Sequence, residues 1–185
     1  MGMTDRQPKF DYDAYLGALP RHVLGPPRLD APTLYPVTRY PLLKSYNGFT
    51  GLERRRGGHL AVWLLAAGCM TLANQCDICG SSGPLAPHGE NYYLPISDPT
   101  LCRACHKFIH LRFYRWDDWR RLVDASAVTG SEWFVMIPRH QIDIAQHLRK
   151  RWGWHAADLE ASPICPFPDF IAEALPDNML HHPKL

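Results

Sequence analysis

Residues 76–110, CDICGSSGPLAPHGENYYLPISDPTLCRACHKFIH, carry the pattern on which the interpretation of the whole chain depends. They contain two C-x-x-C pairs, Cys76/Cys79 and Cys102/Cys105, with 22 residues between the pairs. Each pair can straddle a tight turn, and together the pairs supply the four thiolates of a tetrahedral zinc site. The alternatives are unliganded cysteines or disulfides, and the lack of a recognisable signal peptide disfavours disulfides. We therefore predict one structural zinc ion bound by all four cysteines.

The residues between and after these pairs resemble a short HNH-type zinc domain, a treble-clef (ββα-metal) fold common in phage and mobile-element proteins. Its usual form has paired cysteines, a His-His-Glu-Asp-Tyr run, a Pro-Leu pair and then Leu-Cys-x-x-Cys-His-x-x-x-His. Aligned backwards from Cys102, the matching residues are His88, Glu90, Asn91, Tyr92 and Pro95, and downstream of it His106 and His110. The resemblance covers about a fifth of the chain.

The resemblance implies a second site, at which a divalent ion such as magnesium or manganese binds a scissile phosphate. It places His88 and His110 as ligands of that ion, and hence as the catalytic residues. The general base of nuclease members is the second histidine of the run, and Gly89 stands there in this chain. Glu90 and His106 are nearby in sequence, but neither occupies the position of the base. His106 is also explained by packing or by an outer hydrogen bond, and His88 by a hairpin position without metal.

Because a general base contributes about 10²–10⁴-fold to a rate, the missing histidine favours a non-catalytic zinc module that binds nucleic acid or a protein complex. The alternative is a metal-dependent HNH endonuclease that cuts DNA, and a third possibility is a subunit of a larger assembly. If DNA or RNA is the partner, we expect the basic side chains Arg54, Arg55, Arg56, Arg103, Lys107 and Arg121 to contact phosphates. A solvated run of charges is the other interpretation of the arginine triplet.

Composition adds broad limits. The chain has 185 residues, 46% hydrophobic, with 17 prolines and a formal net charge of +2, which is too weak to identify a partner. Residues 154–185 hold five acidic residues and one lysine, so an acidic tail follows a basic body. No apolar span of 18 residues exists, so we expect no membrane partner and a cytoplasmic location.

The predicted fold class is α+β, with a small treble-clef core of a β-hairpin and a long helix, flanking helices and proline-rich extended arms. We divide the chain into a proline-rich arm (1–58), a buried helix plus the zinc domain (59–127) and a C-terminal helical segment with the acidic tail (128–185). The elements expected are helices at 10–19, 59–73, 102–127, 138–152 and 169–175, and extended pieces at 85–88, 92–96 and 132–137.

Overall fold

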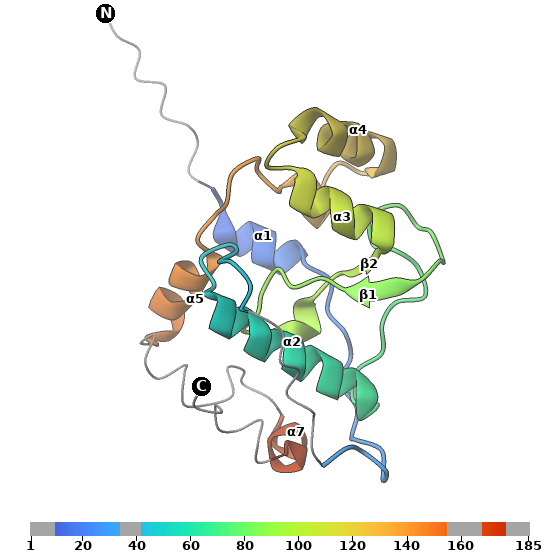
Figure 1. Cartoon of the computed structure of the whole chain (residues 1–185), viewed down its shortest axis with the longest axis vertical. Helices are drawn as coiled ribbons and strands as arrows, with labels where there is room; N and C mark the ends of the chain where they lie inside the picture. The colour runs from blue at the N-terminus through green and yellow to red at the C-terminus, as the bar shows by residue number, and fades with distance from the viewer. Residues whose placement is uncertain (1–9, 34–41, 155–167, 177–185) are drawn as a thin grey trace, which may run out of the picture.

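The computed structural model describes residues 10–33, 42–154 and 168–176 of the chain. It contains helices and one two-stranded antiparallel sheet, so the α+β class is confirmed. Figure 1 shows the sheet beneath α3, with α2 crossing the molecule below it. Two parts of the predicted proline-rich arm (1–9 and 34–41), most of the acidic tail and Cys165 lie outside the described residues.

The sheet pairs β1 (Leu85–Pro87) with β2 (Thr100–Cys102), and Leu85 lies opposite Cys102. The prediction of a returning strand at 92–96 is wrong. That segment turns instead, because the N–H of Leu94 donates to the carbonyl of Asn91 and a 3-10 helix, η1 (Pro95–Ser97), follows. Pro95 has no N–H to give to a strand ladder.

The long helix predicted over 102–127 is also wrong. The structure has α3 (Arg103–Leu111) and α4 (Trp116–Ser126), joined by a turn in which the N–H groups of Tyr114 and Arg115 both donate to the carbonyl of Leu111. Helix α4 therefore packs beside α3 and does not continue it (Figure 1). The break follows from Arg112, whose buried guanidinium bonds the carbonyls of Ile109 and Pro138.

Helix α2 (Gly51–Ala66) begins before the predicted position at residue 59. Thr50 and Glu53 form a reciprocal capping box that starts it, so the arginine triplet lies within this helix. The buried Gly57 lies against Tyr92, since a Cβ at Gly57 would be 2.5 Å from the Tyr92 carbonyl oxygen. This close contact joins α2 to the segment that follows β1.

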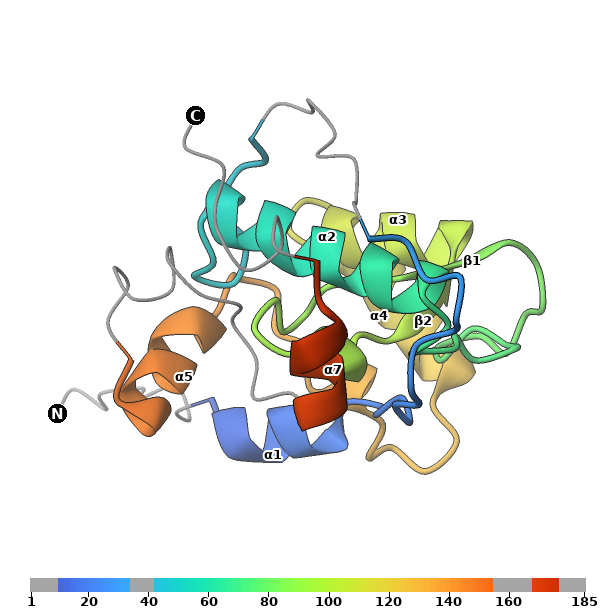
Figure 2. The same ribbon diagram turned by 90° about the horizontal axis from the view of Figure 1, so that it is seen from below.

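The flanks cover the centre. Helix α1 (Tyr12–Ala18) confirms the first predicted helix, and the backbone of residues 22–28 then bonds residues 67–69 at the end of α2 and Ile96. The predicted extended piece at 132–137 is a 3-10 helix, η2 (Trp133–Val135), with Trp133 and Phe134 buried. Figure 2 shows α7 (Asp169–Ala174) beside α2, and Ile171 of α7 belongs with Leu60 and Trp63 of α2 to a second, smaller core.

Helix α5 (Ile144–Trp152) begins later than predicted, because Asp143 caps it, and ends as expected at Gly153 in a left-handed conformation (φ 67°). Its Arg149 pairs with Glu53 of α2. Among the described residues, no helix combines the length and apolar character that crossing a bilayer requires.

Candidate metal centres

The four cysteines come together around the start of α3. Cys76 and Cys79 lie on a turn closed by the Gly80 N–H, which donates to the Cys76 carbonyl at 2.9 Å, with Gly80 at φ 70°. Cys102 is the N-cap of α3, and Cys105 lies in its first turn, where its N–H points at the Cys102 sulfur (3.5 Å). All four sulfur atoms lie within 4.8 Å of one another, close enough to bind a metal ion.

The thiols of this cluster differ in acidity. Burial raises the pKa of Cys102, but the backbone N–H of Cys105 and the Ser81 side chain outweigh it and lower that pKa to about 6. Burial and the neighbouring sulfurs raise the pKa of Cys105. An ion that binds all four sulfurs must therefore displace protons, as thiolate-bound metals do.

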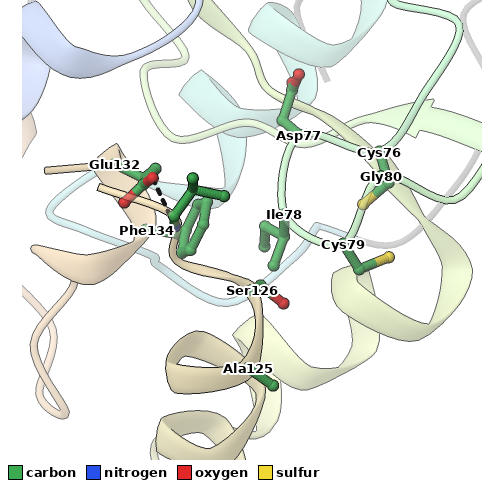
Figure 3. A pocket seen from close by; sticks show the side chains of 10 residues that line it. Cys76, Asp77, Ile78, Cys79, Gly80, Ala125, Ser126, Glu132 and Phe134 are labelled. Carbon is green, nitrogen blue, oxygen red and sulfur yellow. Dashed lines mark hydrogen bonds between the residues drawn. The ribbon is translucent and has the colours of Figure 1, made fainter. Parts of the chain in front are cut away.

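A pocket of about 410 Å³ lies beside the cysteines (Figure 3). The first cysteine turn forms one wall, and the end of α4 with the segment before η2 forms the other, with Ile78 and Phe134 between them. None of the histidines of the resemblance lines it. The pocket is therefore separate from these histidines.

Three histidines, His88, His106 and His110, form a second cluster of possible metal ligands. One ring nitrogen of each of His88, His106 and His110 lies within 4.8 Å of those of the other two. The backbone N–H of His88, which directly follows β1, donates to the Pro99 carbonyl (2.9 Å), while His106 and His110 lie one turn apart on α3. His88 is buried, whereas the other two are partly exposed, so the cluster opens to solvent on the α3 side.

The ring environments of His106 and His110 favour neutral imidazoles. Burial, followed by the charge of His88, lowers the pKa of His106 to about 4. Burial and the charges of His88 and His106 lower that of His110 to about 3. A neutral imidazole keeps the lone pair that a metal needs. The structure thus brings together the two histidines that the resemblance selects and adds His106 as a third donor.

Glu90 supports this cluster from inside. Its carboxylate is fully buried, and its Oε1 lies 2.8 Å from His88 Nε2 and accepts a bond from Tyr46 Oη (2.6 Å). Its Oε2 accepts bonds from Asn47 Nδ2 (2.8 Å) and Tyr15 Oη (2.9 Å). Burial raises the pKa of Glu90, but the bond and charge of His88 and the charge of Arg112 hold it at about 2. A carboxylate so engaged is not free to act as a base.

Gly89 offers no substitute for the missing histidine. A Cβ at this position would lie 2.6 Å from Cζ of Tyr92, so the tyrosine ring fills the space of any side chain. Replacing Gly89 with histidine would therefore displace Tyr92 before it could restore a base.

The predicted phosphate-binding residues separate into three groups. Arg103 and Lys107 are exposed on α3, the helix that carries His106 and His110. Arg54 on α2 donates to Tyr92 Oη (3.2 Å) and lies over the Tyr46 and Tyr92 rings, and Arg55 and Arg56 follow it on the same helix. Arg121 lies on α4 and pairs with Asp118, so it is on a different helix from Arg103 and Lys107.

Sequence reasoning missed Tyr15, Tyr46, Asn47 and Arg112. The Asn47-Gly48 pair marked a turn, and both residues have positive φ (48° and 80°), as a tight hairpin turn requires. Nothing in the local pattern showed that this turn reaches Glu90, 43 residues away. Comparison of the chain with protein-family models, with curated proteins and with solved structures gives no match.

Proposed function

We propose that the protein is a metal-dependent nuclease, with a structural zinc ion at the four cysteines and a second, hydrolytic centre at the three histidines. The convergence of His88, His106 and His110 carries the proposal. Three protein nitrogens leave room for ligands other than protein, which is the arrangement of catalytic and not of structural metal sites.

The donors fit a transition-metal ion. Imidazole suits zinc, nickel or iron, whereas magnesium prefers oxygen ligands, so magnesium is the poorer choice for an all-nitrogen set. When bound, such an ion supplies Lewis acidity, which offsets charge developing on a phosphate and acidifies water.

The chain's own residues would do the rest. Glu90 orients His88 from the buried side, and the exposed Arg103 and Lys107 would hold the nucleic-acid backbone beside the open side of the cluster. Without a side chain at Gly89, no residue fills the base position of the resemblance. We therefore expect cleavage about 10²–10⁴-fold slower than with a positioned base.

Cleavage is tested by incubating the zinc-loaded protein with supercoiled plasmid and with labelled single-stranded DNA and RNA, adding Zn²⁺, Mn²⁺ or Mg²⁺ in turn. We expect slow cleavage with a transition metal, its loss in His110→Ala and its retention in the matched control His140→Ala, an exposed histidine outside the cluster. Cleavage that survives His110→Ala refutes the histidine centre.

A second candidate is nucleic-acid binding without cleavage, which the filled space at Gly89 favours. Under either function, the double variant Arg103→Glu/Lys107→Glu should weaken binding and reduce the slope of log affinity against log salt by about 0.9 for each lost contact with a duplex. The control is Arg120→Glu, since Arg120 is already paired with Asp124 on α4. Affinity that falls equally in both proteins would remove α3 from the interface.

The zinc site has its own test. Cys102→Ser should lower the zinc content below one equivalent and unfold the centre, because binding and folding are coupled at such sites. Cys69→Ser is the matched control, since Cys69 is also buried but lies outside the cluster. Pure, folded parent protein with less than about half an equivalent of zinc would contradict a structural zinc ion.

A further inference from the structure

A chain of hydrogen bonds runs from Arg112 to His88 through Tyr46 and Glu90. It begins at a fully buried guanidinium, whose Nη1 donates to Tyr46 Oη at 3.0 Å. A guanidinium can only donate. The oxygen of Tyr46 therefore accepts, and the hydroxyl proton must be given to another acceptor, which is Glu90 Oε1 at 2.6 Å.

The other oxygen of Glu90, Oε2, also accepts hydrogen bonds. Nδ2 of Asn47, which has no lone pair to offer, donates to Oε2 at 2.8 Å, and Tyr15 Oη donates to it at 2.9 Å. Both carboxylate oxygens thus act as acceptors. His88 Nε2 lies 2.8 Å from Oε1, so this nitrogen must carry the proton of the ring. In a neutral imidazole the lone pair is then on Nδ1.

We propose that Tyr46 is a positioning residue for the histidine centre, whose hydroxyl holds in place the Glu90 oxygen that accepts the His88 Nε2 proton, so that Nδ1 of His88 is presented to the metal ion. The inference rests on the proposed metal centre. It assigns a role to the turn at residues 46–49, which lies far from the motif in sequence and holds Tyr46 by paired backbone bonds with Phe49 (3.0 Å each).

Two tyrosines make a matched pair for the test. Tyr46 and Tyr15 are both buried and both donate to Glu90, but Tyr46 shares Oε1 with His88, whereas Tyr15 bonds the far oxygen. Tyr46→Phe keeps the ring that packs on His110 (centroids 5.4 Å apart) and removes only the hydroxyl. Tyr15→Phe removes one buried bond to the same carboxylate and is the control for that loss, whereas Tyr46→Phe also removes the bond that Arg112 donates.

The first measurement is the tautomer of His88, read from ¹⁵N imidazole shifts of the full-length, zinc-loaded protein without an ion at the histidines. We expect the Nε2–H tautomer in all three proteins, because the ionised Glu90 accepts from Nε2 in each, and a shifted Nε2–H resonance in Tyr46→Phe alone, because only that variant loses the second bond to Oε1. A parent protein with its proton on Nδ1 overturns the proposal without any variant, and so does a Tyr46→Phe protein with the parent's spectrum.

The second measurement is calorimetric titration of the histidine centre with Zn²⁺. Loss of an outer-shell partner typically lowers metal affinity about 10–100-fold. We expect that loss in Tyr46→Phe and unchanged affinity in Tyr15→Phe, and equal losses in both would contradict a positioning role. If the parent itself binds no second ion, the metal centre of the proposed function is refuted, whereas the comparison of the His88 imidazole spectra still decides what Tyr46 does.

Discussion

Glu90→Gln should destabilise the protein by about 3 kcal/mol at pH 7. The folded pKa of Glu90 is about 2, against an ordinary value of 4.5, because the bond and charge of His88 and the charge of Arg112 outweigh the effect of burial. A folded pKa below the unfolded one means that the ionised carboxylate stabilises the fold above about pH 4.5, and that this contribution is lost as the pH falls toward 2. At about 1.36 kcal/mol per pH unit, the shift corresponds to about 3 kcal/mol. Removing one partner from a buried charge network has a similar cost, about 3–5 kcal/mol.

Asp98→Asn is the matched control for this substitution. Asp98 is also a buried acid, but burial and the charge of Glu90 raise its pKa well above the ordinary value, so its charge contributes no stability that could be lost. We expect urea denaturation at pH 7, followed by tryptophan fluorescence, to show a lower midpoint at unchanged slope for Glu90→Gln and a change under about 1 kcal/mol for Asp98→Asn. Equal losses in the two variants would show that the network does not use the charge of Glu90.

Two further predictions concern α2 and the histidines. Gly57→Ala should destabilise the protein, because its Cβ would meet the Tyr92 carbonyl oxygen at 2.5 Å. In Gly58→Ala the added Cβ meets nothing within 4 Å, so this variant should stabilise the protein by up to about 1 kcal/mol. Thermal melts of the two variants check this, and equal shifts in melting temperature would contradict the contact between Gly57 and Tyr92. In protein without an ion at the histidine centre, His106 and His110 have folded pKa values (about 4 and about 3) below the ordinary 6.5, so protonation favours unfolding and stability should fall as the pH drops from about 6.5 toward these values. Melting temperatures measured from pH 7 to 4 should fall less steeply in His110→Gln, and the same slope as in the parent would refute the assignment.

Local pattern predicted those parts of the structure that local chemistry determines. The cysteine turns, α1, the end of α5 at Gly153 and the helix at 169–174 follow from spacing, caps and glycine. No proline or glycine marks the break between α3 and α4 in the sequence. The break was not predicted because the buried Arg112 bonds the carbonyl of Pro138, 26 residues away. The early start of α2 depends on the capping box at Thr50. It was not predicted because Gly57 and Gly58, which lie inside the helix, indicate a turn in the sequence.

The candidate site divides in the same way. His88 and His110 were found from the motif, because ligand spacing is a property of the hairpin and one helix turn. From sequence, His106 is explained by packing or by an outer hydrogen bond, since sequence alone does not show whether a ring faces its neighbours. The partners of Glu90 could not be found from sequence, because Tyr15 lies 75 residues and Tyr46 44 residues away, where only the tertiary fold connects them.

The buried carboxylate also determines how far the metal-binding stretch is separable from its host. A peptide of residues 76–110 would retain the four cysteines and three histidines of the two clusters, and its sequence would look like an independent module. It would lack Tyr15, Tyr46 and Asn47, so Glu90 would keep His88 alone among its four hydrogen-bond partners. The stretch is therefore not an independent zinc-finger module, and transferring it to another protein would transfer the ligands without the residues that orient them.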